Sequence, residues 1–255
     1  MQSSRWQADN DVRRFDAGRM SGRVVPRDPN RGIDQLCIDG QPVAGAQLLR
    51  VDLAAIDPAD PSPVEVVSRG DDLAVTYADR PAKQMRAQVY WRADGPLPRT
   101  AAKFELLVSV QTGLLDSCPR TCTRSHLPAN QVLRWTQSSD GFAPLKLATV
   151  HRQPLAESRQ PTGYLFRVAG TEFSYAEMVH PSDARETTVA THRIGDAPGG
   201  ELAAEVGHEL FADHLEKGVI LRARVLGVVV DRADDEATAI EHFARFLSAK
   251  LPLTT

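Results

Sequence analysis

Glu177, His180 and Asp183 stand three residues apart in the segment FSYAEMVHPSDARETTVATHR, which runs from position 173 to position 193. A glutamate, a histidine and an aspartate could serve as the base, the acid and the orienting group of an acid/base site. On a helix, a spacing of three would place these side chains on one side. Pro181 follows His180, however, and a residue before proline is pushed out of the helical region.

The residues before His180 alternate and include aromatic types, which predicts a strand. In a strand Glu177 and His180 point to opposite faces, so we do not expect a compact local triad. Two interpretations of His180 remain. It is a proton donor at the end of a strand, where sites are commonly built, or it hydrogen-bonds within the His-Pro-Ser-Asp turn and Asp183 caps the segment that follows.

Two arginines interrupt the most apolar segment, GVILRARVLGVVV at positions 218–230. In a strand Arg222 and Arg224 lie about 7 Å apart on one face. Each must reach water or a partner, because burying an unpaired guanidinium is costly. Glu105, on another expected strand, is a suitable partner. The opposite face of the segment is expected to belong to the core, with Val219, Leu221, Ala223 and Val225.

Further long polar side chains occupy the non-core faces of two other expected strands. They are Arg86, Gln88, Tyr90 and Arg92 in QMRAQVYWR, and Ser109 and Gln111 in KFELLVSVQTGLL. Arginine and carboxylate groups offer bidentate hydrogen bonds, and tyrosine offers a ring plane with a polar tip. This chemistry suits the hydroxyls and the ring face of a sugar, and it also suits a small carboxylate. The alternative is an outer sheet face in contact with water.

The elements that carry these residues are mostly strands. Alternation of period two recurs in at least five segments, and hairpin turns are expected at Asp39-Gly40 and near positions 169–171. One helix is expected at about 235–249, from apolar residues at i, i+3, i+4 and i+7, and ELFADHLEKG at 209–218 is a second, shorter candidate. The pattern predicts an all-β fold, a large two-sheet antiparallel sandwich with a C-terminal helix. Residues 1–22 are expected to form a polar leader, ordered at most in part, and residues 23–255 a single domain.

Composition excludes several classes of partner. The 255 residues carry a formal net charge of −3, so no basic field favours nucleic acid or an anionic membrane. No apolar run approaches the roughly 18 residues that cross a bilayer. The spacing of Cys118 and Cys122 fits no standard zinc site, so we expect neither a metal nor a cofactor. The start of the chain lacks the apolar stretch of a signal peptide, and the small, odd number of cysteines favours a cytoplasmic location.

The succession of long β segments over residues 23–230 resembles the galactose mutarotase-like supersandwich, the fold of aldose epimerases. GIDQLCIDGQPV resembles an early hairpin of such domains, and LEKGVILRARVLGVVV resembles a late β ribbon. His180-Pro181 is similar to the His-Pro or His-Thr context in which epimerases of the family have a histidine that acts as an acid. The resemblance implies a carbohydrate-binding or carbohydrate-active protein whose ligand is a sugar or uronic acid.

For an enzyme, the resemblance implies acid/base chemistry at a sugar ring. His180 would donate the proton and a carboxylate such as Glu105 or Glu209 would be the base. The ligand would be bound by Arg86, Tyr90, Gln111, Arg222 and Arg224. The alternative function is a non-catalytic β-sandwich that binds another protein or serves as an accessory module.

Overall fold

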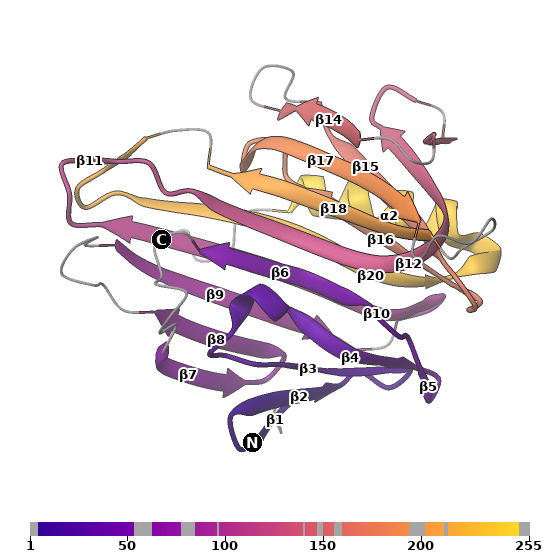
Figure 1. Ribbon diagram of the computed structural model, residues 1–255, viewed down its shortest axis with the longest axis horizontal. Coiled ribbons are helices and arrows are strands. Elements are labelled where there is room, and N and C mark those ends of the chain that lie inside the picture. Colours follow the sequence, from indigo (N-terminus) through magenta and orange to yellow (C-terminus); the bar gives the residue numbers. More distant parts are fainter. Residues whose placement is uncertain are drawn as a thin grey trace.

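The computed structural model describes residues 5–53, 63–77, 85–95, 97–139, 141–146, 150–155, 160–193, 202–211 and 214–249. Antiparallel strands make up most of this part of the chain, and one long helix follows them (Figure 1). This confirms the predicted all-β sandwich with a C-terminal helix. Among the described residues, no helix is long and apolar enough to cross a bilayer.

The strands form three connected sheets, which we call sheets 1, 2 and 3; sheets 1 and 2 make up one layer of the sandwich and sheet 3 the other. Sheet 1 contains β1 (Trp6–Asp9), β2 (Val12–Asp16), β3 (Met20–Val24), β4 (Ile33–Ile38) and β5 (Gln41–Pro42). Sheet 2 has the order β6 (Gln47–Leu53), β12 (Thr121–Thr136), β18 (Leu202–Leu210), β17 (Ala184–Arg193) and β14 (Val150–Pro154).

Sheet 3 is the largest layer. Its order is β7 (Pro63–Arg69), β8 (Asp72–Tyr77), β9 (Met85–Asp94), β10 (Thr100–Thr112), β20 (Ile220–Asp231), β16 (Phe173–Val179), β15 (Thr162–Val168), the second half of β12, and β13 (Phe142–Pro144). A separate pair joins β11 (Asp116–Ser117) to β19 (Leu215–Glu216). Short 3-10 turns lie at η1 (Pro29–Arg31) and η2 (Arg232–Asp234).

Strand β12 connects the two larger sheets. Its first half pairs with β6 and β18, and its second half pairs with β15 and β13. The change occurs around Pro128, just before a register irregularity between Ala129 and Gln131. Proline cannot donate to a ladder and irregularities bend a strand, so this position suits a strand that leaves one sheet for another.

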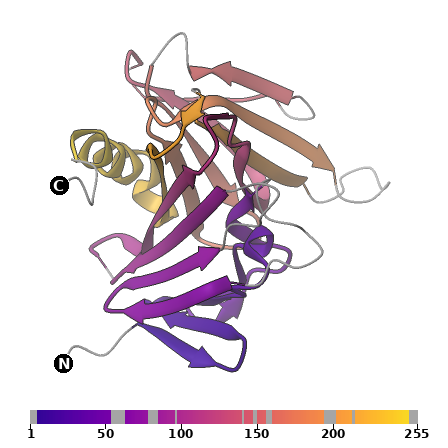
Figure 2. The ribbon, with the colours of Figure 1, turned by 90° about the vertical axis from the view of Figure 1, so that its left-hand side faces the viewer.

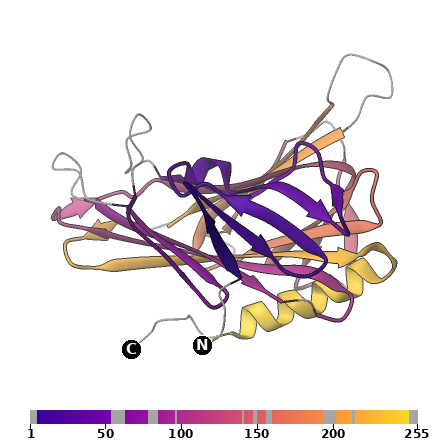
Figure 3. The ribbon, with the colours of Figure 1, turned by 90° about the horizontal axis from the view of Figure 1, so that it is seen from below.

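Sheets 1 and 2 pack against the inner face of sheet 3, and helix α2 (Asp235–Ser248) covers part of its outer face (Figures 2 and 3). The inner core includes Trp91, which was expected to pack there, and Phe104 and Val225. The helix has its own cluster, in which Phe243 contacts the sheet above Gly163. A Cβ atom on Gly163 would lie 2.1 Å from a ring carbon of Phe243, so glycine lets the helix approach this closely.

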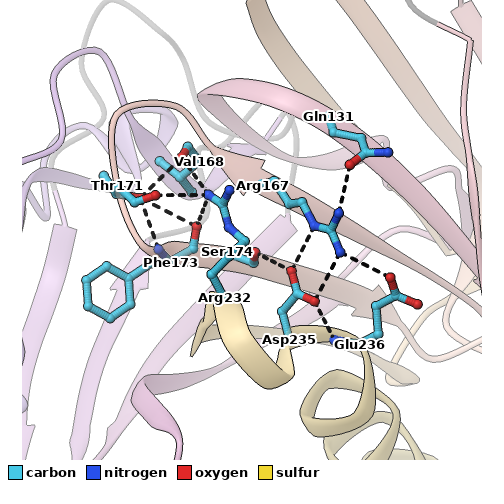
Figure 4. Close-up of polar contacts among 9 residues, drawn as sticks. All are labelled: Gln131, Arg167, Val168, Thr171, Phe173, Ser174, Arg232, Asp235 and Glu236. Atoms are coloured by element: carbon cyan, nitrogen blue, oxygen red, sulfur yellow. Dashed lines mark hydrogen bonds and ion pairs between the residues drawn. The ribbon is translucent and has the colours of Figure 1, made fainter.

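Arg167 fixes the first turn of α2 to sheet 3 (Figure 4). Its guanidinium donates to Asp235 at 3.0 Å, to Glu236 at 3.1 Å and to Gln131 at 2.9 Å. Ser174 donates to Asp235 at 2.7 Å. Acidic side chains in a first turn also complement the helix dipole, so this cluster has a structural role.

Arg232 closes the β15–β16 hairpin in the same region (Figure 4). One of its terminal nitrogens donates to the carbonyl oxygens of Val168, Thr171 and Phe173, at 2.8, 3.2 and 2.7 Å. Burial lowers the pKa of this guanidinium. Three carbonyl acceptors on one terminal nitrogen hold the shape of this turn.

Three expectations are wrong. Residues 1–22 were expected to be a polar leader, but they include β1, β2 and the start of β3, and Trp6 is buried with its indole NH on the Asp71 carbonyl at 2.9 Å. No second helix forms in the described part of 209–218, where β18 continues to Leu210 and β19 follows, while residues 212–213 lie outside the described residues. Val219 is 44 % exposed, because β20 begins only at the next residue.

The hairpin predictions are confirmed. Asp39 and Gly40 join β4 to β5 with φ values of 48° and 76°, as a tight turn of this kind requires. The β15–β16 hairpin turns at Gly170, whose φ is 68°.

Candidate functional site

Six of the residues predicted to form a site lie on one face, the outer face of sheet 3. They are Arg86, Tyr90, Glu105, Gln111, Arg222 and Arg224. The register sets Gln111 opposite Arg86 and Glu105 opposite Arg92. Directly opposed residues share a face. These side chains therefore lie on one face of the sheet, as the alternation of period two in the sequence predicts.

Arg224 is buried among structural partners. Its Nε lies 3.7 Å from Asp183, its Nη1 donates to the Ala249 carbonyl at 3.1 Å, and its guanidinium stacks 5.1 Å above the ring of Phe246. Asp183 also accepts the backbone NH of Arg224 at 3.0 Å. These contacts fasten the end of α2 to β20, and a ligand would have to displace them to use this arginine.

His180 hydrogen-bonds within the His-Pro-Ser-Asp turn, as the second of the two interpretations of its sequence predicts. Its Nδ1 lies 2.7 Å from the Ser182 hydroxyl and 3.6 Å from Asp183, and its ring packs against Phe246. Its backbone NH bonds the Arg224 carbonyl, which places it across β20 from Glu105. Two strand spacings and two residues along the strand give a Cα separation of roughly 12 Å, and the Arg224 side chain belongs to the strand between them.

Glu177 points inward, away from His180, into a polar cluster between sheets 2 and 3. It accepts from the hydroxyls of Ser125 and Tyr175, and its other oxygen lies 3.0 Å from His208 Nε2. Thr187 lies 2.8 Å from His208 Nδ1. The side chains of Glu177 and His208 have no exposed surface, so this cluster satisfies polar groups in the core and cannot meet a ligand directly.

The outer face of sheet 2 presents a second group of polar side chains. Of this group, only Glu209 was a candidate site residue in the sequence analysis. His126 on β12 and His192 on β17 stack with their ring centroids 5.7 Å apart. Ala203, on the strand between them, pairs with His192 in the register. Its methyl group leaves room above β18 for the two rings to meet.

Glu205 lies beside this histidine pair. It stands directly opposite His126 on one side and Ala190 on the other. Arg50 approaches it at 3.9 Å and Arg124 at 4.0 Å. The carboxylate is therefore held between two cations, close to an imidazole and open to solvent on its outer side.

The pKa of His126 is lowered, chiefly because the ring is half-buried. Glu205 acts in the opposite direction and raises it, while His192 and Arg50 lower it further. The ring is consequently neutral at pH 7, since the ordinary value is only about 6.5. A neutral imidazole can accept a proton or a hydrogen bond.

We expect the Cε1 proton of His126 to titrate with a midpoint below 6.5 in an NMR pH series. Glu205→Gln should lower that midpoint further, because a group that stabilises imidazolium is lost. His192→Asn should raise it, because a repelling neighbour is lost. Shifts of the same sign in the two variants would contradict this account of the charges.

A hollow of about 220 Å³ opens next to Glu205 on the same face, and we call it the sheet-2 hollow. Its lining comprises Cys122, Thr123, Arg124, Glu186, Thr188, Ala190, Glu205, Gly207, His208 and Glu209. Gly207 lies in the middle of these strands, opposite Arg124 and Thr188. The missing side chain at Gly207 leaves the space above the sheet open.

Within the described part of the chain, no three histidine, cysteine, aspartate or glutamate side chains are placed to hold a metal ion. Cys37, Cys118 and Cys122 are free thiols. Burial raises the pKa of Cys122, which keeps it protonated beside the hollow.

Solved structures share this architecture. A proposed aldose 1-epimerase from Klebsiella pneumoniae aligns with a TM-score of 0.58 and 8 % identity, over 98 % of this chain and 90 % of that one. A proposed mutarotase, YeaD, from Salmonella typhimurium gives 0.54 and 9 %, over 89 % and 93 %. A GalM/aldose epimerase homologue from C. elegans gives 0.52 and 6 %, over 91 % and 99 %. The chain has the mutarotase-like fold.

The resemblance seen in the sequence is therefore confirmed at the level of the fold. No protein-family model matches the sequence, and no curated protein matches it either. At identities of 6–9 % the similarity extends to the fold alone and does not show which side chains act.

Proposed function

We propose that the protein binds a monosaccharide on the outer face of sheet 2 and promotes acid/base chemistry at its ring. The observation that carries this proposal is the stacked pair His126–His192 beside a carboxylate, Glu205, held between two arginines at the rim of a hollow. The printed descriptions of the similar structures, which concern mutarotases and aldose epimerases, support the class of ligand.

The side chains suit the parts of a sugar. Glu205 can accept hydrogen bonds from two neighbouring hydroxyls, and Arg124 can donate to a hydroxyl or to the ring oxygen. Thr188, which lines the hollow, supplies a further hydroxyl. A small hollow with a few convergent polar groups is the usual form of a site for a small polar ligand.

The reaction we assign is interconversion of the anomers of a reducing sugar. A base takes the proton of the anomeric hydroxyl and an acid gives one to the ring oxygen. The bond between C1 and the ring oxygen then breaks to give the open-chain aldehyde, and it forms again on the opposite face of the carbonyl as the two proton transfers are reversed. The reaction therefore needs no co-reactant. His126, held neutral by burial, is the base in this scheme and His192 the proton donor.

Saturation-transfer NMR with glucose, galactose and glucuronic acid tests the binding proposal. We expect transfer to at least one sugar at millimolar concentration. Glu205→Gln should weaken binding about tenfold or more, because hydrogen bonds to a charged group are lost. Anomer exchange measured on the same samples should fall to the uncatalysed rate in His126→Gln.

The matched control is Glu105→Gln, on the outer face of sheet 3. That face, with His180 as proton donor and Glu105 as base, is the competing location. Weaker binding in Glu105→Gln with an unchanged Glu205→Gln would move the site there. Absence of transfer to every sugar, with folded protein, would favour a non-catalytic interaction module.

A further inference from the structure

Strand β7 forms an open edge of sheet 3 (Figure 1). It pairs with β8 on one side, and no described residue pairs with its other side. The register with β8 shifts between Pro63 and Glu65 and then runs without interruption from Glu65 to Arg69. An open edge presents backbone NH and carbonyl groups to which another extended strand can bind.

This edge is apolar at its centre and charged at its two ends. Val67 is 42 % exposed, and Val64, at the register shift, is 64 % exposed. Glu65 and Arg69 are exposed on either side of Val67. Side chains two residues apart share a face of a strand, so these three lie on the outer face of sheet 3, while Val66 packs against the inner core.

The two charges are not neutralised within the part of the chain that the structure describes. Neither Glu65 nor Arg69 forms a side-chain hydrogen bond or an ion pair with a described residue. Asp72 stands opposite Arg69 on β8, but Arg92 binds its carboxylate at 2.8 Å. Glu65 stands opposite Thr76, which has no charge. About 13 Å of extended chain separates Glu65 from Arg69, so they cannot pair with each other.

A second copy of the chain complements this edge. When two copies of an edge pair antiparallel about a two-fold axis, directly opposed residues share a face. An axis at Val67 opposes the two Val67 side chains and sets Glu65 of each copy against Arg69 of the other. An axis at Val66 would oppose Glu65 to Val67. An axis at Ser68 would oppose Arg69 to Val67. Of these registers, only the one about Val67 neutralises both charges, and Val67 is also the centre of the regular run.

We propose that the protein forms a two-fold dimer through the open edges of β7, so that sheet 3 continues from one copy into the other. Backbone hydrogen bonds would join the two strands, and the opposed Val67 side chains would form the apolar centre. Two Glu65–Arg69 pairs would fix the register. A two-fold interface uses the same surface of both copies, so each substitution acts twice. This proposal concerns assembly and is independent of the proposed sugar site.

Sedimentation velocity of the full chain, over a concentration series in the micromolar range, tests the dimer. We expect the fraction of dimer to rise with concentration and to fall as salt is added. Glu65→Arg and Arg69→Glu should each weaken dimerisation about tenfold or more, because each change creates two like-charge pairs. Arg120→Glu, at an exposed arginine just before β12, is the control for charge reversal and should dimerise like the parent.

Mixing the variants separates a charge effect from damage to the fold. Equal amounts of Glu65→Arg and Arg69→Glu should form a mixed dimer, because two positive charges on one strand then meet two negative charges on the other. The double variant should also recover the dimer. A parent that stays monomeric throughout the series would overturn the proposal. So would a dimer that both charge reversals leave intact, since it would use another surface, or single variants that stay monomeric when mixed.

Discussion

Replacing Glu177 with alanine is expected to lower the free energy of unfolding by about 3–5 kcal/mol, because it removes the shared acceptor of a buried hydrogen-bonded cluster. Both carboxylate oxygens are in use, one by His208 and the other by Ser125 and Tyr175. In Glu177→Ala these donors would keep their burial and lose their acceptor. Urea unfolding followed by fluorescence measures the change.

Glu177→Gln is the matched variant, since it keeps the shape and one acceptor oxygen and should lose less. Glu172→Ala, in the exposed turn of the hairpin that carries Glu177, controls for loss of a carboxylate and should leave stability nearly unchanged. If Glu177→Ala unfolds at the same urea concentration as the parent, the cluster between the sheets is not formed as described.

Ala223→Asp is the second large effect, with an expected loss of about 3–5 kcal/mol in the free energy of unfolding. Ala223 is fully buried on the inner face of sheet 3, opposite Val108 of β10. A carboxylate there would be buried without a partner, which is among the most damaging single changes. Thermal unfolding of the variant and the parent measures the loss of stability, and the yield of soluble protein measures it where the variant does not fold.

Ile220→Asp provides the comparison on the same strand, because Ile220 is 45 % exposed. We expect it to cost little. Equal damage from both variants would show that any charge on β20 is harmful, and no damage from Ala223→Asp would show that the register of β20 is wrong.

Much of the fold was readable from local patterns. Alternation of period two identified the inner and outer faces of β9, β10 and β20, because each of these strands packs one face on the core. Turn chemistry at Asp39-Gly40 located a hairpin, and spacing around Phe243 located the helix. The first strands were missed because β1 and β2 are short and polar, and their burial depends on sheet 1 as a whole.

The site was harder to predict, for physical reasons. His126, His192 and Glu205 come from three separate strands, and only the pairing of β12, β18 and β17 brings them together. No spacing of residues within a single segment predicts such a group. The rule that a buried guanidinium needs partners was correct for Arg224, but Glu105 is not among the partners that the structure shows. Asp183 comes from the turn before β17, and the Ala249 carbonyl comes from the end of α2.

Glycine positions held a signal that the sequence reading did not use. Gly227 interrupts the most apolar strand, and it lies opposite Glu177. A Cβ atom there would lie 2.6 Å from the hydroxyl oxygen of Tyr175. Gly207 similarly interrupts β18 at the hollow. Glycine within a strand commonly marks such a close approach or an opening.

The most direct test of the central claim is a map of amide chemical shifts on addition of glucose or galactose at millimolar concentration. If the sugar binds on the outer face of sheet 2, the largest changes should fall on Glu205, Gly207 and Glu209 of β18 and on His126 of β12. Changes concentrated instead around Arg86, Tyr90 and Gln111, on the outer face of sheet 3, would contradict the account, as would an unchanged spectrum.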